Sequence, residues 1–239
     1  MLFLNLTGLF GFIKWDAYWA AGAWSIGNEM VFYALFPFFI FFTKYQKKLM
    51  VLLSLTILAI YLYFAFYKIA LDPAGYFINY INPLNNAFLF LGGYLIGLLF
   101  DRIHIKLYWI IPLLLAAFGL FIFYPASGDR VSLLIGPTRL LFTLICFVMC
   151  FSFYKLTQDL PKLIHKPLTL LGEASYSVYL LHPIIYLLVG IFRDHSIYFN
   201  EYVRVTISII LTLIISHFTY NYFEKYFMKF GQSRNTNPV

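Results

Sequence analysis

The chain has 239 residues, of which 62% are hydrophobic, 22% aromatic and only 11% charged. A soluble domain of this length carries far more charge on its surface, so the composition excludes a soluble globular protein and indicates an integral membrane protein. The formal net charge of +7 comes from Lys and Arg in short runs between apolar blocks. These runs form no single basic face, which excludes a nucleic-acid partner and favours contact of the cations with membrane lipid.

The chain opens with an apolar stretch over residues 1–13. This stretch has neither the basic start nor the small-residue end of a cleavable signal peptide. It is also shorter than the ~20 residues that a membrane-spanning helix needs. We expect it to be the end of a larger helical region whose beginning lies upstream.

Seven longer apolar segments follow, each close to the ~20 residues that cross a bilayer core at ~1.5 Å per residue. They are apolar without interruption, whereas the strands of a membrane barrel alternate apolar and polar side chains. The sequence therefore predicts an all-α fold, a polytopic membrane helical bundle with seven transmembrane helices. The predicted spans are residues 24–43, 49–67, 84–100, 107–124, 131–154, 168–192 and 203–223.

No polar or Gly/Ser-rich linker divides the chain, so residues 1–239 are interpreted as a single membrane domain. The loops alternate in charge, with eleven Lys and Arg side chains in one set and five in the other. Because cytoplasmic loops carry the excess of positive charge, the richer set is predicted to be cytoplasmic, together with the basic tail at 225–239. Seven spans then place the N-terminus outside the cell and the C-terminus in the cytoplasm.

The first span opens with W-S-I-G-N-E-M-V-F-Y-A-L-F-P at residues 24–37, which includes the carboxylate of Glu29. A lone acid at the mouth of a membrane helix costs a few kcal/mol unless it has a partner or a water-filled cavity. Glu29 is therefore a candidate functional residue. Ser25, Glu29 and Tyr33 follow one another at intervals of four residues and share one helix face, which is predicted to face something other than lipid.

Two further ionisable side chains are expected at a similar depth, Arg139 in the fifth span and His182 in the sixth. The alternating direction of the spans places Arg139 ~12 Å from the outer end of its span. His182 falls in the outer half of its own span. We therefore expect Glu29, Arg139 and His182 to meet in one outward-facing cavity, with an Arg139–Glu29 ion pair that only holds two helices together as the alternative.

The sixth span also carries a polar and aromatic stripe, because Ser175, Tyr179, His182 and Tyr186 are spaced by four, three and four residues. Pro183 follows His182 directly. Proline lacks a backbone N–H, so it is expected to loosen the helix and leave carbonyl groups free for a polar cavity.

Two other patterns have simple structural interpretations. Cys146 and Cys150 lie one helical turn apart in an apolar span, where a disulfide is geometrically disfavoured, and they are interpreted as core residues. They complete no metal-binding spacing, so no metal is expected. Gly93 and Gly97 match the small-xxx-small pattern and are interpreted as a helix-packing contact.

Two stretches of the chain resemble motifs of one known family. Residues 24–37 resemble the segment W-S-L-S-V-E-E-Q-F-Y-L-L-W-P of the membrane acyltransferase-3 family, which includes O-antigen and exopolysaccharide O-acetylases. The stretch L-G-E-A-S-Y-S-V-Y-L-L-H-P at residues 171–183 is similar to that family's L-G-x-x-S-Y-S-x-Y-L-x-H-P. The two motifs occur in the family's order, and the resemblance covers essentially the whole chain.

The resemblance implies a membrane O-acyltransferase. Such an enzyme transfers an acyl group, often acetyl, from cytoplasmic acyl-CoA to a hydroxyl of a carbohydrate or cell-envelope glycan on the other face of the membrane. Acyl-CoA, above all acetyl-CoA, is then a co-substrate, and no bound cofactor is expected. The resemblance also favours the cytoplasmic (inner) membrane of a bacterium.

O-acyl transfer needs a base to take the proton of the acceptor hydroxyl and donors to stabilise an oxyanion. On the resemblance, Glu29 orients the family's catalytic histidine or the acceptor, and Arg139 binds the acyl donor's phosphate or the oxyanion. His182 lines the acceptor side or acts as the base itself. The residues expected to bind substrate are Trp24, Ser25, Tyr33, Ser175 and Tyr179.

The chain departs from the family's first motif at Gly27, Asn28 and Met30, and Met30 leaves Glu29 as the only carboxylate there. The family's first helix, three helices before that motif, has an arginine and a histidine that are taken as the catalytic pair. Nothing in this chain matches the pair, so the resemblance describes a C-terminal portion that lacks three helices. The alternative is a non-catalytic membrane transport or lipid-handling protein, or a degenerate acyltransferase that serves as a partner.

Overall fold

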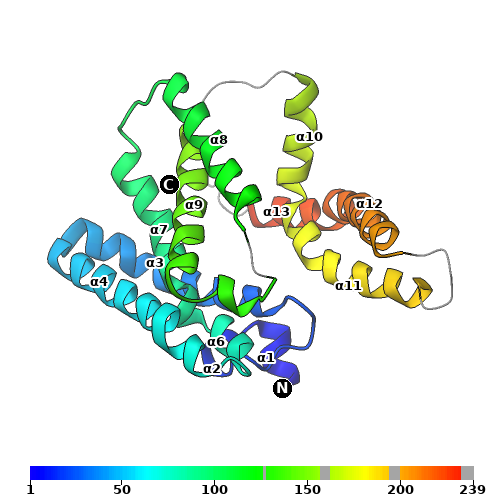
Figure 1. Cartoon of the computed structure of the whole chain (residues 1–239), viewed down its shortest axis with the longest axis horizontal. Coiled ribbons are helices and arrows are strands. Elements are labelled where there is room, and N and C mark those ends of the chain that lie inside the picture. The colour runs from blue at the N-terminus through cyan, green and yellow to red at the C-terminus, as the bar shows by residue number, and fades with distance from the viewer. Residues whose placement is uncertain (126–127, 157–161, 194–199, 233–239) are drawn as a thin grey trace. The chain divides into compact units, whose positions relative to one another are not determined.

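The computed structural model describes residues 1–125, 128–156, 162–193 and 200–232. All regular structure within these ranges is helical, which confirms the predicted all-α class (Figure 1). The chain divides into two compact units. The first unit is Met1–Trp19 with Trp24–Gln158, and the second is Ala20–Ala23 with Asp159–Val239. The single membrane domain over residues 1–239 stays a prediction.

Within the described ranges, five helical stretches are long and apolar enough to cross a membrane. A further pair of helices passes the same test together, and α8 (Leu107–Phe123) is apolar but has only 17 residues. The five stretches are Trp24–Tyr45, Lys47–Leu71, Tyr76–Phe100, Gly136–Lys155 and Glu201–Lys229. An integral membrane protein with five or six spans is therefore supported, and the count of seven stays a prediction.

The first unit is a bundle of long helices preceded by two short ones. Helices α3, α4 and α7 contact one another, α7 contacts α9, and α9 packs against α8. Buried side chains of α3, α4 and α7 form its core, namely Phe39, Met50, Ile57 and Leu91. The elements are α1 (Leu2–Thr7), α2 (Phe10–Ile13), α3 (Trp24–Tyr45), α4 (Lys47–Tyr63), η1 (Phe64–Lys68), α5 (Ile69–Leu71), α6 (Tyr76–Tyr80), α7 (Pro83–Phe100), α8, η2 (Val131–Leu133) and α9 (Gly136–Lys155).

Local chemistry explains where α7 and α9 begin. The side chain of Asn82 accepts a hydrogen bond from the backbone N–H of Leu84 at 2.9 Å, and Pro83 occupies the first helical position, where its missing N–H costs nothing. Helix α9 begins at Gly136, whose φ of 60° lies in the left-handed region that favours glycine. The fifth span therefore starts five residues later than the predicted position 131.

Close approach of helices in the first unit depends on glycines other than those predicted. Nothing lies within 4 Å of a Cβ built on Gly93 or Gly97, so the predicted packing contact at this pair is wrong. A Cβ on the neighbouring Gly92 would collide with the ring of Phe147 on α9. The helix face that packs is set by the surrounding bundle, so it cannot be read from the spacing of two glycines alone.

The second unit contains α10 (Lys162–Glu173), α11 (Ser175–Arg193), α12 (Glu201–Thr219), η3 (Tyr220–Glu224) and α13 (Lys225–Gln232). The sixth span, predicted to be continuous over 168–192, is bent by 71° between α10 and α11. The bend lies at the buried Ala174, and Pro183 lies inside the uninterrupted α11. Ser177, just after the bend, donates a hydrogen bond to Glu224 Oε1 at 2.5 Å. This bond joins the first turn of α11 to η3.

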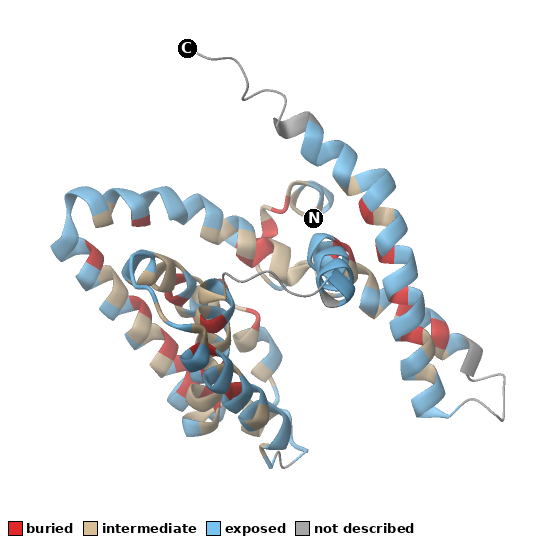
Figure 2. Cartoon of the chain, turned by 90° about the horizontal axis from the view of Figure 1, so that it is seen from above, coloured by how far each residue is buried: buried red, intermediate tan, exposed pale blue. Residues whose placement is uncertain are grey.

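Helices α11 and α12 pack against each other along their length. The buried polar positions of α12 recur every fourth residue, at Ser208, Thr212 and Ser216, which puts them on one face. Buried positions recur at intervals along the helices in Figure 2, with exposed positions between them, as expected for helices that pack along one face. Of the predicted basic tail at 225–239, the part up to residue 232 is helical and residues 233–239 lie outside the described residues.

Candidate functional site

Glu29 lies in the second turn of α3, where its carboxylate accepts a hydrogen bond from the hydroxyl of Tyr33. The two residues are four apart, so this contact confirms that they share a helix face. Glu29 is half-buried, whereas Tyr33 is 60% exposed. The side chains of the predicted polar stripe thus become more exposed from Ser25 and Glu29, which are half-buried, to Tyr33.

A cavity of about 300 Å³ lies beside Glu29, and we call it the α3–α7 cavity after the helices that line it. The rings of Phe32 and Phe90 stack with centroids 5.1 Å apart and hold the two helices together. Trp24 and Ser25, both predicted to bind substrate, line this cavity, and Tyr33 does not. The lining residues are Trp24, Ser25, Asn28, Glu29, Phe32, Asn86, Leu89 and Phe90.

Arg139, in the first turn of α9, is buried with 7% of its surface exposed. Its Nη2 donates a hydrogen bond to Asn85 Oδ1 at 2.6 Å, and its guanidinium lies over the ring of Tyr61, 4.6 Å from the centroid. Asn85 is held in this orientation because its Nδ2 donates to the carbonyls of Asn79 and Tyr80, both at 3.1 Å. Arg139 Nη1 also donates to the Leu134 carbonyl at 3.5 Å, so the partners of this buried cation are an amide oxygen, a backbone carbonyl and an aromatic face, all neutral.

Arg139 also lines a cavity of about 400 Å³, the α7–α9 cavity. Cys146 and Cys150 lie along its wall, and both are exposed, so their interpretation as core residues is wrong. The positions 139, 143, 146 and 150 recur at helical spacing and place all four side chains on one face of α9. The lining residues are Tyr61, Tyr80, Asn86, Leu89, Gly93, Leu133, Leu134, Arg139, Phe142, Thr143, Cys146, Phe147 and Cys150.

Glu29 and Arg139 line two different cavities of the same unit. The two cavities share Asn86 and Leu89 of α7, so they border each other along that helix. The alternative of an Arg139–Glu29 ion pair is not found, and among the described residues no carboxylate lies within 4 Å of the Arg139 guanidinium.

His182 belongs to the second unit, where Pro183 determines its hydrogen bonding. Proline has no N–H to bond the carbonyl four residues earlier, which is that of Tyr179. The Nδ1 atom of His182 lies 2.7 Å from this oxygen and 3.3 Å from the carbonyl oxygen of Val178. A carbonyl only accepts, so Nδ1 carries a proton, and in the neutral imidazole Nε2 is then the nitrogen with the free lone pair. The carbonyl that proline frees is thus paired with His182, whereas the sequence predicted that it would face a polar cavity.

His182 lines a cavity of about 230 Å³ between α11 and α12. The hydroxyl of Ser208 in this cavity wall has no hydrogen-bond partner among the residues that the structure describes. Four of the eight lining residues are aliphatic, so this part of the cavity suits an apolar group. The lining residues are Val178, His182, Tyr186, Val205, Ser208, Ile209, Thr212 and Leu213.

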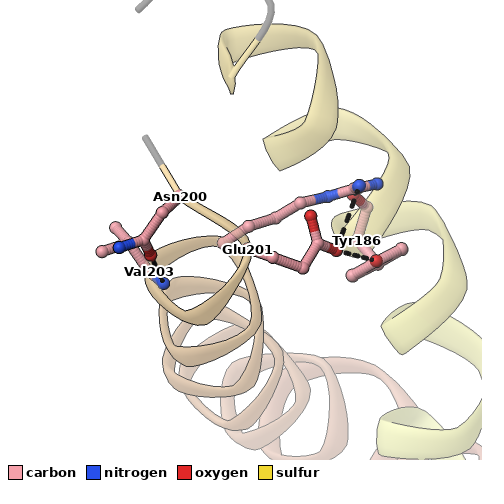
Figure 3. A network of polar contacts seen from close by, with 5 residues as sticks. Tyr186, Asn200, Glu201 and Val203 are labelled. Carbon is pink, nitrogen blue, oxygen red and sulfur yellow. Dashed lines mark hydrogen bonds and ion pairs between the residues drawn. The ribbon is translucent and has the colours of Figure 1, made fainter. Parts of the chain in front are cut away.

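Tyr186 is fixed one turn after His182 by a polar cluster that joins α11 to α12 (Figure 3). The Tyr186 hydroxyl donates to Glu201 Oε1 at 2.7 Å, and Arg204 Nη2 donates to the Tyr186 carbonyl at 3.2 Å. The Arg204 guanidinium lies 3.7 Å from the centroid of the Tyr186 ring and 3.5 Å from Glu201 Oε1. Asn200 caps α12 by accepting from the N–H of Val203 at 2.9 Å.

The remaining predicted substrate residues of the second unit lie outside its cavity. Ser175 is the exposed first residue of α11. The ring of Tyr179 lies 5.8 Å from that of His182 and is 37% exposed. Both share a helix with His182, but neither lines the cavity between α11 and α12.

Sequence reasoning missed several residues that the structure brings to these sites. Asn85 and Asn86 lie in a predicted span, and polar amides in an apolar segment are a signal that was available. Asn28 was noticed only as a departure from the family motif. The regular spacing of Ser208 and its neighbours on α12 was likewise visible in the sequence.

Comparison with known proteins adds one match. The model of a protein family described as an acyltransferase domain matches residues 2–221, which is most of the chain. No curated protein and no solved structure matches the chain.

Proposed function

The chain belongs to the membrane acyltransferase-3 family, and from this premise we propose that it transfers an acyl group, in the first place acetyl, from acyl-CoA to a hydroxyl of a carbohydrate or cell-envelope glycan. Membership of the family supports the general reaction class, acyl transfer by a membrane protein. The donor, the acetyl group, the glycan acceptor and the bacterial cytoplasmic membrane are parts of the proposal. So is the orientation with the C-terminus in the cytoplasm, which rests on the excess of Lys and Arg in one set of loops.

The observation that carries the proposal is the environment of Arg139. A buried guanidinium loses several kcal/mol of hydration free energy, and its neutral partners Asn85 and Tyr61 offset only part of this loss. A negatively charged group in the α7–α9 cavity would offset the rest. The phosphate of an acyl donor, or the oxyanion that forms when a hydroxyl attacks its thioester, supplies such a charge.

The proposed reaction requires a proton acceptor. The acceptor oxygen attacks the thioester carbonyl while its hydroxyl proton passes to a base, the C–S bond then breaks, and the base returns the proton to the leaving thiolate. His182 would take this proton at Nε2, because its Nδ1 donates to the Tyr179 carbonyl. Glu29, which accepts from Tyr33, would orient the acceptor, and Trp24 and Ser25 would line its side of the site.

Mass spectrometry of envelope polysaccharides tests the proposal. We expect deletion of the gene to remove the mass of one acetyl group from a polysaccharide, and the wild-type gene to restore it. Complementation with His182→Ala is expected to leave the mark absent while the protein is still expressed. A polysaccharide that is unchanged by deletion would contradict the proposal and favour a non-catalytic transport or lipid-handling protein.

A further inference from the structure

Among the positions where the first motif differs from the family pattern are Gly27, Asn28 and Met30, and two of these three departures have a packing role. A Cβ on Gly27 would collide with the ring of Phe10, and one on Gly11 would collide with the backbone of Gly27, so α2 and α3 meet backbone to backbone. The sulfur of Met30 occupies the space beside Gly8. These two departures dock the N-terminal helices onto α3.

The third departure, Asn28, has no such role. Only 4% of Asn28 is exposed, and neither its Nδ2 nor its Oδ1 has a hydrogen-bond partner among the described residues. The family motif has valine here, a side chain of similar size without polar atoms. Burial of an amide without partners is unfavourable compared with burial of valine, so the asparagine is not explained by the stability of the fold.

Asn28 lies in the wall of the α3–α7 cavity, together with Glu29 and Trp24. An asparagine amide presents a donor and an acceptor side by side, the Glu29 carboxylate adds an acceptor, and Trp24 adds an aromatic face. No Lys or Arg is among the described residues that line this cavity. Its chemistry therefore favours a neutral ligand with neighbouring donors and acceptors over an anion.

We propose that Asn28 is a specificity-determining residue that pairs with two adjacent hydroxyl groups of a neutral sugar. One hydroxyl accepts a hydrogen bond from Nδ2 while its neighbour donates one to Oδ1, and both polar atoms of Asn28 are then satisfied. The inference rests on the proposed function, because it names the part of the acceptor that the α3–α7 cavity holds. The α7–α9 cavity with Arg139 borders it through Asn86 and Leu89, so a neutral acceptor and an anionic donor group would occupy neighbouring cavities.

The test measures binding of methyl glycosides without any acyl donor. The full chain is purified in a detergent that has no sugar headgroup, and methyl hexosides are compared with deoxy analogues that lack one hydroxyl of an adjacent pair. Binding is followed by the fluorescence of Trp24, with the other tryptophans replaced by phenylalanine, and by the midpoint temperature of unfolding.

We expect at least one methyl hexoside to bind, its deoxy analogue to bind about threefold to fivefold more weakly through the loss of one hydrogen bond, and the Asn28→Val variant to bind the hexoside about tenfold more weakly or worse through the loss of two. Asn28→Val should also unfold at a higher temperature, because it removes two unpartnered buried groups. Ser216→Ala is the matched control, because the Ser216 hydroxyl is also buried, has no hydrogen-bond partner within the described part of the chain, and lines none of the three cavities above. It should raise the unfolding temperature and leave binding unchanged.

The inference is overturned if no methyl hexoside binds the wild type, or if Asn28→Val and the isosteric Asn28→Leu both bind as the wild type does. Asn28→Leu also replaces Asn28→Val if the latter does not fold. A failure of the proposed function alone would give a different result: glycosides would bind and depend on Asn28, but no acyl group would be transferred. Transfer with an unchanged KM for the acceptor in Asn28→Val would instead refute the inference and leave the proposed function intact.

Discussion

His182 donates a hydrogen bond from Nδ1 to the backbone carbonyl oxygen of Tyr179 at 2.7 Å. This oxygen is the one that Pro183 leaves without a backbone donor, so the proline and the histidine act together. Pro183 lies inside the uninterrupted α11, and the contact orients the imidazole ring of His182. A histidine followed by a proline thus places its ring on the carbonyl group that the proline leaves without a donor.

Pro183→Ala tests this relationship. The new N–H of residue 183 would compete for the Tyr179 carbonyl, so we expect a higher free energy of unfolding, by up to ~3 kcal/mol, but a lower kcat for acyl transfer. The pH profile of kcat should change as the imidazole loses its fixed hydrogen bond. Pro112→Ala in α8 is the control, since it should stabilise its helix and leave transfer unchanged. An unchanged kcat and pH profile in Pro183→Ala would mean that this contact has no part in the reaction.

Arg139→Met tests whether Arg139 serves a ligand or the fold. Because the guanidinium has no carboxylate within 4 Å among the described residues, we expect the variant to unfold at the same temperature as the wild type or above it. Transfer should fall by about 100-fold or more, the usual effect of removing a group that stabilises charge in a transition state. Arg139→Lys keeps the charge but not the planar fork and should be intermediate. Destabilisation of Arg139→Met by ~3–5 kcal/mol would instead indicate a broken buried ion pair.

Asn85→Leu should destabilise the first unit by about 1–3 kcal/mol, because it removes the 2.6 Å acceptor of the Arg139 guanidinium and the side-chain donor of the Asn79 carbonyl. The Tyr80 carbonyl keeps Asn86 Nδ2 as its donor at 2.8 Å. In the double variant with Arg139→Met, part of this loss should be recovered, since no buried cation remains to be paired. A double-mutant cycle by thermal or denaturant unfolding measures this coupling. Strict additivity of the two changes would contradict the contact.

The Tyr186 cluster is expected to stabilise the α11–α12 pair through two separable contributions. Tyr186→Phe removes the hydrogen bond to Glu201 and keeps the ring under Arg204, so it should cost about 1 kcal/mol of unfolding free energy. Tyr186→Leu also removes the cation–π contact and should cost about 1 kcal/mol more. Equal stability of the two variants would show that the stacked guanidinium contributes nothing.

Gly11→Ala should weaken the packing of α2 on α3, because a Cβ at this position would collide with the backbone of Gly27. A backbone atom cannot rotate away, so we expect a lower unfolding temperature. Gly97→Ala is the matched control, as nothing lies within 4 Å of its Cβ. Its free energy of unfolding should rise by ~1 kcal/mol, the advantage of alanine over glycine in a helix, and its unfolding temperature should rise accordingly. The reverse order of the two variants would contradict the proposed packing.

The contacts that could be predicted from the sequence are local ones. Glu29 and Tyr33 lie four residues apart, and helix geometry alone brings their side chains together. The apolar segments were recognised for the same reason, since hydropathy over one span needs no knowledge of its neighbours. Hydropathy did not predict the bend at Ala174, because the direction of α11 after the bend depends on its packing against α12.

The partners across helices could not be predicted. Asn85 and Arg139 are 54 positions apart, and their contact depends on how α7 and α9 are packed. The same packing leaves Cys146 and Cys150 exposed and makes Gly92 the close contact in place of Gly93 and Gly97. Hydrophobic patterning indicates that a helix packs somewhere, but it does not determine which side chain it meets.

By itself, the sequence determined that the protein is an all-helical membrane protein of the acyltransferase-3 family, because composition, span length and motif order are properties of the chain read in one dimension. Only the tertiary structure decided that Arg139 has neutral partners and that the Asn28 side chain has no hydrogen-bond partner among the described residues. The physical reason is that a buried polar group is satisfied or left unsatisfied by whatever the rest of the fold brings within about 3 Å of it.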